Sequence, residues 1–117
     1  MEWDIEVTDE FKAWYRSLSE PERDAVIRVV DRILVDGPNV DFPFSSDIKG
    51  SRHGEMRELR IQHAGRPYRV LYAFGPRRMA ILLLGSDKTG DDRWYKRHVP
   101  IADKLYDLYL RELEEEG

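Results

Sequence analysis

The chain has no cysteine, which excludes disulfide bonds, thiolate zinc sites and cysteine nucleophiles together. It also lacks any apolar run near the roughly 20 residues that a membrane-spanning helix needs, since the longest run, Met79–Leu84, has the length of a strand. The first residues, Met1–Asp4, are acidic, whereas a secretory signal begins basic and continues apolar. These absences predict a soluble cytoplasmic protein that does not bind a membrane.

Positive charge is in the minority, but it is concentrated in one part of the chain. The 117 residues carry a net charge of −4, which alone argues against a nucleic-acid partner. Residues 49–98 nevertheless hold 12 Lys and Arg against 5 Asp and Glu (+7), and the remainder holds 7 against 18 (−11). This division favours a module that presents one cationic surface to a polyanion. The alternative is that the two parts simply pair with each other.

The first third of the chain predicts a strand and two helices. Glu2–Val7 alternates between acidic and apolar residues, as a strand with one solvated face does. Thr8 is placed to cap a first helix, on which apolar residues recur every three or four positions over residues 11–18. Ser19–Glu22 has the pattern of a capping box that opens a second helix, which Gly37 and Pro38 end. The two helices are therefore expected to form a hairpin.

Residues 39–54 are predicted to form a loop, and three strands follow it. The strand-like runs are Met56–His63, Pro67–Phe74 and Arg78–Ser86. Short turns that contain glycine separate them, which favours an antiparallel meander. Met79–Leu84 is apolar at every position, as is typical of a central strand covered on both faces.

The C-terminal part predicts helix in two pieces. Asp91 and Asp92 are expected to open a short helical turn through Tyr95, and Pro100 to lie in the first turn of a separate last helix. The predicted fold class is therefore α+β, with an N-terminal strand, a helical hairpin, a three-stranded antiparallel meander and a C-terminal helix. One domain is expected to span residues 1–117.

The basic stretch contains a candidate catalytic patch. Glu58 and Arg60 lie two residues apart and so share one face of a strand. Arg69 lies on the next strand, and Lys88 follows the central strand. If these strands are neighbours, the four side chains converge, and a carboxylate among cations suits phosphodiester chemistry. The alternative is a salt-bridged, solvated face of the sheet.

Other constellations are less specific. The three histidines lack the spacing of metal ligands, so no metal site is expected. Asp91 and Asp92 could hold magnesium, but acids in the first turn of a helix more often stabilise the helix itself. Trp94 and Tyr95 could stack on a base or pack the last helix.

Four segments together resemble a known superfamily, namely Lys49-Gly50, Met56–Arg60, Gly65–Tyr72 and Leu82–Thr89. They are similar to the RelE/ParE toxins, and most of all to the HigB-like branch with its phage-derived members. The resemblance covers nearly the whole chain, because the predicted order of elements matches as well.

The resemblance implies the RelE-like microbial RNase fold and the toxin of a type II toxin–antitoxin system. Such a toxin cuts translated messenger RNA in the ribosomal A site, without a metal or cofactor. The implied partners are a cognate helix-turn-helix, HigA-like antitoxin, the ribosome with its mRNA, and operator DNA reached only through the antitoxin.

Carried over to matching positions, the resemblance implies that Arg60 and Arg69 grip the scissile phosphate. Lys88 falls where relatives place a basic residue near the leaving group, and Tyr95 where several place an aromatic that stacks on a base. Glu58 occupies a position that is often lysine in ribosome-dependent toxins. A carboxylate there would be ionised at neutral pH and could accept the 2′-hydroxyl proton.

Further residues of the basic stretch are expected to contact RNA. These are Lys49, Arg57, Arg66 and His98, and His98 is also our candidate for the general acid. Two other functions stay open at this point. A ParE-like toxin shares the fold and inhibits DNA gyrase without cutting RNA, and a pure binding module would use the basic sheet only to dock an antitoxin.

Overall fold

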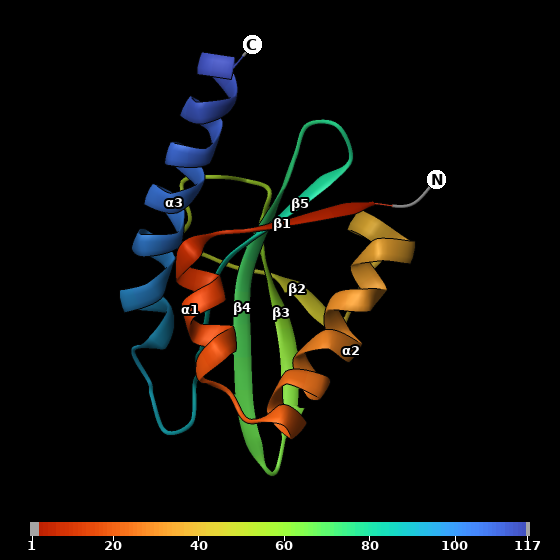
Figure 1. The fold of residues 1–117 in the computed structure, drawn as a ribbon. Helices are drawn as coiled ribbons and strands as arrows, with labels where there is room; N and C mark the ends of the chain where they lie inside the picture. The colour runs from red at the N-terminus through yellow and green to blue at the C-terminus, as the bar shows by residue number, and fades with distance from the viewer. Residues whose placement is uncertain (1–2, 117) are drawn as a thin grey trace.

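The computed structural model describes residues 3–116 and contains a five-stranded sheet with the strand order β1-β5-β4-β3-β2. Helices α1 and α2 cover one face of the sheet, and α3 packs on the other (Figure 1). The predicted α+β class and order of elements are confirmed. The elements are β1 (Asp4–Val7), α1 (Asp9–Ser17), α2 (Glu20–Asp36), the 3-10 helix η1 (Gly37–Asn39), β2 (Ser45–Asp47), β3 (Met56–His63), β4 (Arg66–Gly75), β5 (Met79–Asp87) and α3 (Trp94–Glu116).

The helical hairpin forms as predicted, and each helix begins at its expected cap. The Thr8 hydroxyl accepts a hydrogen bond from the backbone N–H of the third residue of α1 at 3.0 Å. Ser19 and Glu22 form a reciprocal capping box at the start of α2. Helix α2 ends at Gly37, where φ is +52° and a Cβ would lie 2.1 Å from Nε1 of Trp3. Glycine at this position therefore allows both the backbone conformation and the close approach of the indole.

The predicted meander of β3, β4 and β5 is confirmed, and two further strands extend it. Strand β1 joins β5 in parallel, and β2 pairs with β3 in antiparallel fashion. The predicted first strand began at Glu2, which lies outside the described residues. The prediction of loop throughout residues 39–54 was wrong at Ser45–Asp47, which forms β2. This strand is too short and too polar to give an alternating pattern, and it is held by pairing with β3.

Strand β5 is the buried centre of the molecule, as its uniformly apolar sequence predicted. Leu82 packs with the helical hairpin, whereas Leu83 packs with α3. A bulge interrupts the pairing of β4 with β5, so that Leu83 has no partner in the register. Because of this extra residue, Leu84 also packs on the α3 side instead of alternating back to the hairpin side. The bulge therefore sets which face the end of β5 presents.

The C-terminal helix is continuous, and the prediction of a separate turn before Pro100 was wrong. Helix α3 runs from Trp94 to Glu116 with Pro100 inside it. Asp91 forms an Asx turn just before the helix, in which its carboxylate accepts a hydrogen bond from the backbone N–H of Arg93 at 3.0 Å. Trp94 is fully buried against the sheet, and this packing holds the residues before the proline in helical conformation. No helix in residues 3–116 is long and apolar enough to cross a membrane.

Hydrogen bonds to two aspartates of α3 hold the loop between β2 and β3 against this helix. Asp103 is only 3% exposed and accepts hydrogen bonds from the Ser51 hydroxyl at 2.6 Å and the Arg52 backbone N–H at 3.1 Å. One turn later, Asp107 accepts from Nε2 of His53 at 2.7 Å. These contacts hold the start of β3 beside α3.

Replacing Asp103 with alanine is expected to destabilise the fold by about 1 kcal/mol, because two hydrogen bonds to a buried carboxylate are lost and their part-buried donors are left without this acceptor. Thermal unfolding of Asp103→Ala measures the loss, and Lys104→Ala, at the exposed neighbouring position, is the control. An unchanged melting temperature for Asp103→Ala would show that this clasp does not stabilise the fold.

A second link joins α2 to β4, because the Tyr68 hydroxyl donates a hydrogen bond to the Glu22 carboxylate. This bond is the largest cause that lowers the pKa of Glu22 from 4.5 to about 2. Burial, followed by the same bond, raises the pKa of Tyr68 from 10.0 to about 12. Each group therefore keeps the charge state that suits the hydrogen bond over a wide pH range.

We expect Tyr68→Phe to raise the pKa of Glu22 toward its ordinary value, as carboxyl NMR titration would measure. Since the folded-state pKa of Glu22 is lowered, its stabilising contribution is complete above pH 4.5 and is lost as the pH falls toward 2. The stability difference between wild type and Tyr68→Phe should shrink over that same interval. A difference that stays constant from pH 6 to pH 2 would contradict the linkage.

Candidate active site

A buried carboxylate on β3 lies at the centre of the candidate site. The side chain of Glu58 is 5% exposed. Its Oε1 accepts a hydrogen bond from the Tyr95 hydroxyl at 2.5 Å and lies 3.4 Å from Nε of Arg69. Its Oε2 accepts from the Ser46 hydroxyl at 2.6 Å and from Nη1 of Arg60 at 3.2 Å. We call these five residues, which come from β2, β3, β4 and α3, the Glu58 cluster.

The two arginines of the cluster lie directly opposite each other. Arg60 and Arg69 are register partners on β3 and β4, so their charges repel unless an anion lies between them. The side chain of Arg69 is 7% exposed and that of Arg60 is 29% exposed. Within residues 3–116, the buried Nε of Arg69 finds no hydrogen-bond acceptor in good geometry. This buried nitrogen instead faces Oε1 of Glu58 at 3.4 Å, so Arg69 is held in the cluster by charge.

Tyr95 stands in the first turn of α3, where it connects the carboxylate to Lys88. Burial, followed by the hydrogen bond to Glu58, raises the pKa of Tyr95, and the nearby Arg69 opposes part of this effect. The phenol is therefore protonated at neutral pH. Nζ of Lys88 lies 5.6 Å from the centroid of the Tyr95 ring. The backbone N–H of Lys88 donates to the carbonyl of Pro67 at 2.8 Å, which anchors this loop to β4.

Three of the predicted catalytic residues thus contact one another, Glu58 with Arg60 and Arg69, and Lys88 adjoins them at the Tyr95 ring. Arg57 does not join them. Its guanidinium pairs with Asp47 and donates to the Ser45 hydroxyl and the Val40 carbonyl, each at 3.2 Å. It also lies 3.4 Å from the Tyr72 hydroxyl, and Tyr72 packs on the hairpin side of the sheet. Arg57 therefore ties β2 and η1 to β3 on the face opposite Glu58.

The other predicted RNA-binding residues lie outside the cluster. Lys49 is exposed in the loop after β2, and Arg66 lies in the β3–β4 hairpin region, 3.5 Å from Asp87. His98 is one turn along α3 from Tyr95, and its ring stacks on Trp94 at 4.4 Å. Nδ1 of His98 lies 2.7 Å from the Trp94 carbonyl, which can only accept. A neutral His98 therefore presents Nε2 as an acceptor, and it needs a second proton to act as an acid.

Sequence reasoning missed Ser46. It lies directly opposite Glu58 in the register of β2 with β3 and supplies one of the shortest hydrogen bonds to the carboxylate. Nothing in the local sequence distinguishes this serine from its neighbour Ser45, because its position depends on a strand pairing that has no pattern of its own.

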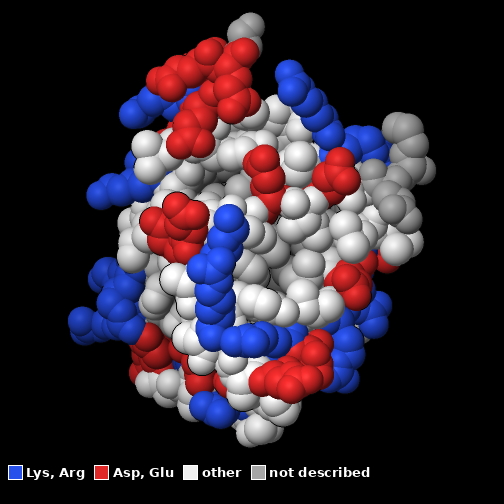
Figure 2. Space-filling view, in the orientation of Figure 1, with Lys and Arg blue, Asp and Glu red and all other residues white. Residues whose placement is uncertain are grey.

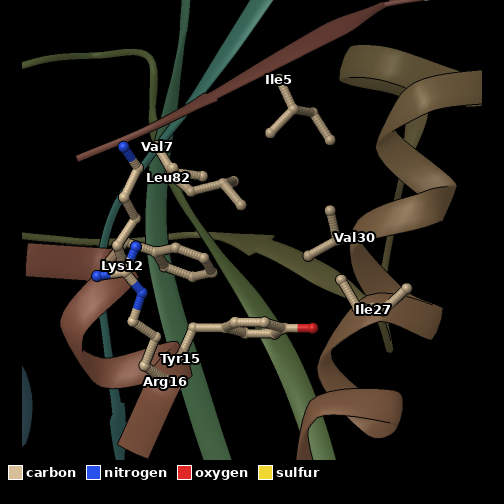
Figure 3. Close-up of a pocket in the computed structure, with 9 residues that line it drawn as sticks. Ile5, Val7, Lys12, Tyr15, Arg16, Ile27, Val30 and Leu82 are labelled. Carbon is tan, nitrogen blue, oxygen red and sulfur yellow. The ribbon is translucent and has the colours of Figure 1, made fainter. Parts of the chain in front are cut away.

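A separate apolar hollow of about 280 Å³ opens on the opposite face of the sheet, between α1 and α2 (Figure 3). It is lined mainly by apolar side chains such as Ile5, Val30 and Leu82, with Lys12 and Arg16 at one side. No carboxylate, hydroxyl nucleophile or imidazole is among its lining residues apart from the Tyr15 phenol. It therefore offers little for catalysis, and the Glu58 cluster is the better candidate.

Part of the negative charge of the chain lies far from the Glu58 cluster, at the C-terminal end of α3. Figure 2 shows Asp and Glu side chains gathered over the C-terminal end of α3, whereas blue and red are mixed over the hairpin face. Glu115 lies 20 residues along α3 from Tyr95, or about 30 Å at the rise of an α-helix. This separation exceeds the screening length of about 8 Å at physiological salt, so these acids do little to repel an anion at the cluster.

A family model described as "Phage derived protein Gp49-like" matches residues 13–107. Among curated proteins, the chain is 38% identical to the putative toxin HigB3 of Mycobacterium tuberculosis over 83% of this chain and 84% of that protein. It is 31% identical to the putative toxin HigB2 of the same organism over 97% of this chain, but it spans only 57% of that protein.

Two solved structures share the fold. A mutant of the Escherichia coli toxin RelE in the free state matches with a TM-score of 0.62 over 86% of this chain and 99% of that one, at 11% identity. RelE in the archaeal RelE–RelB complex of Pyrococcus horikoshii matches with a TM-score of 0.57 over 77% of this chain and 99% of that one, at 15% identity. At such low identity, these matches establish the arrangement of the elements only.

Replacing Glu58 with alanine is expected to destabilise the protein by about 3 kcal/mol, because Arg69 would be left buried without a counter-charge. Arg66→Ala, which removes an exposed ion pair, should cost less than 1 kcal/mol. Urea unfolding would measure both. The double variant Glu58→Leu/Arg69→Met removes both buried charges and should recover part of the stability that Glu58→Ala loses. If it recovers none, the unpaired charge of Arg69 is not the cause of that loss.

Proposed function

Because the chain belongs to the family of phage-derived Gp49-like proteins, in the HigB-like branch of the RelE-superfamily toxins, we propose that it is the toxin of a type II toxin–antitoxin system. The proposed activity is ribosome-dependent endoribonuclease cleavage of translated mRNA, which stops protein synthesis in the cytoplasm. The observation that carries this proposal is the buried Glu58 carboxylate between two arginines and a tyrosine hydroxyl.

In the proposed reaction, the scissile phosphate binds to Arg60 and Arg69. As the phosphate draws these guanidinium groups toward its non-bridging oxygens, a lone pair of Glu58 becomes free to accept the proton of the 2′-hydroxyl. The 2′-oxygen then forms a bond to phosphorus while the bond from phosphorus to the 5′-oxygen breaks. The products are a 2′,3′-cyclic phosphate and a 5′-hydroxyl end.

Cationic side chains of the protein stabilise the negative charge that develops during this step. The two arginines stabilise the charge that develops on the phosphoryl oxygens. Lys88, beside the Tyr95 ring, is assigned to the leaving 5′-oxygen, to which it donates a proton. Since three cationic side chains supply the charge that a metal ion would otherwise provide, we propose that cleavage does not need a divalent cation.

The proposed partner is an antitoxin, which would block the Glu58 cluster until it is removed. The archaeal relative by fold was solved as a RelE–RelB complex. For this chain, we propose a helix-turn-helix antitoxin of the HigA kind, through which the pair would bind operator DNA. The HigB-type relatives do not favour the ParE-like alternative of gyrase inhibition.

Primer extension on a defined mRNA in a reconstituted translation system tests the proposed activity. The wild type should cut translated message within A-site codons and leave free RNA intact. Glu58→Gln keeps the size and an acceptor oxygen but loses the base, and should lower the cleavage rate at least 100-fold. Lys88→Ala should lower it at least tenfold.

The matched control is Lys104→Ala, an exposed lysine on α3 for which full activity is expected. Folded Glu58→Gln protein that cuts at the wild-type rate would remove Glu58 from the mechanism. Message left intact by the wild type, together with inhibited supercoiling by purified gyrase, would replace the nuclease proposal with the ParE-like one. If cells that express the protein without an antitoxin grow normally, both toxin hypotheses fail, and the remaining one is a binding module whose basic sheet docks an antitoxin.

A further inference from the structure

An exposed aromatic side chain lies beside the Glu58 cluster and takes no part in the core. Phe42, in the segment between η1 and β2, is 68% exposed. The guanidinium carbon of Arg60 lies 5.1 Å from the centroid of its ring. The same guanidinium contacts Glu58 at 3.2 Å. The exposed ring of Phe42 therefore lies next to Arg60, which is one of the two residues proposed to bind the scissile phosphate.

The exposure of Phe42 does not come from a loose loop, because hydrogen bonds fix the backbone on both sides of it. Its N–H donates to the Asp41 carboxylate at 2.8 Å, and the N–H of Phe44 donates to the Asp41 carbonyl at 2.9 Å. The Phe44 carbonyl accepts from the N–H of Arg60 at 2.8 Å, and the Phe44 ring packs on the core with Arg32 over it at 3.5 Å. Phe44 thus anchors the segment to the core, whereas Phe42 faces solvent.

A basic groove begins next to Phe42 and runs between β3 and α2. It encloses about 420 Å³, and Pro43 and Phe44, which follow Phe42 in the chain, are among its lining residues. Arg28, Arg60 and His63 are among its lining residues, and none of its lining residues is acidic. Arg60 therefore borders both the Glu58 cluster and this groove. A polyanion bound at Arg60 can continue into the groove without meeting a carboxylate there.

We propose that Phe42 and this groove bind the nucleotide next to the scissile phosphate, with its base stacked on Phe42 and its outer phosphate beside Arg28. The inference rests on the proposed RNA cleavage and adds a subsite to it. Stacking on an aromatic ring beside an arginine is how proteins hold single-stranded nucleic acid without reading its sequence strictly. It also explains why a phenylalanine is held open to water at this position.

The test is the primer-extension assay at limiting and at saturating ribosome-bound message. Phe42→Ala should lower kcat/KM about tenfold and lower kcat much less, because it removes binding and not chemistry. Phe42→Tyr should restore cleavage. The loss in Phe42→Ala should be larger where the flanking nucleotide is a purine, since a purine has more surface to stack. Arg28→Ala should lower kcat/KM about threefold.

Val35→Ala is the matched control for an exposed apolar side chain on the outer face of α2, and Arg111→Ala for an exposed arginine on α3. Both should cut as the wild type does. Thermal unfolding should give the same midpoint for all five variants, which separates a binding loss from a folding loss.

The outcomes distinguish this inference from the proposed function. If the wild type does not cut, the proposed function fails and the subsite with it. If the wild type cuts and Phe42→Ala has the same kcat/KM and the same codon pattern, only the subsite is wrong. Full cleavage by Phe42→Ala combined with weaker binding of the antitoxin would assign this surface to a protein partner instead.

Discussion

The ion pair of Glu58 with Arg69 is the interaction on which the rest of the site depends. The two charges are almost completely buried, and they are tolerated because each is the counter-charge of the other. Hydrogen bonds from Ser46 and Tyr95 also satisfy lone pairs of the Glu58 oxygens. These contacts join β2 and α3 to the middle of the sheet. The Glu58 carboxylate, our candidate general base, therefore also connects β2, β3, β4 and α3. Its effect on the cleavage rate and its effect on the stability of the fold have to be measured separately.

The two faces of the sheet have different roles: one packs the core against the helical hairpin, and the other carries the candidate site. The face under α1 and α2 is filled by an apolar core, and Arg57 on that side is fully engaged in holding the chain together. The face under α3 is apolar over one half and carries the Glu58 cluster at the other, where the first turn of α3 brings Tyr95 across. Two arginines three residues apart on one strand thus differ in role, since only Arg60 shares the side of Glu58.

Much of this arrangement follows from local patterns in the sequence. The caps at Thr8 and Ser19, the meander and the shared face of Glu58 and Arg60 each depend on residues near one another in the chain, and all are confirmed. Two features depend on distant contacts and were not predictable: the strand at Ser45–Asp47 and the helical residues before Pro100. In each case a pairing or a buried aromatic outweighs the local propensity.

The bulge at Leu83 has a consequence for how this fold can change over time. Leu84 lies opposite Leu71, and both pack on the α3 side, so the residues after the bulge follow the pairing with β4 and carry the loop with Lys88 toward that side. The position of the ammonium group therefore depends on the register of β5 with β4, and not on the identity of the apolar residues of β5. Deletion of Leu83, which has no partner in the register, would close the bulge and keep Leu84 opposite Leu71, so this fold can lose the bulge and still hold the lysine on the side of the arginines.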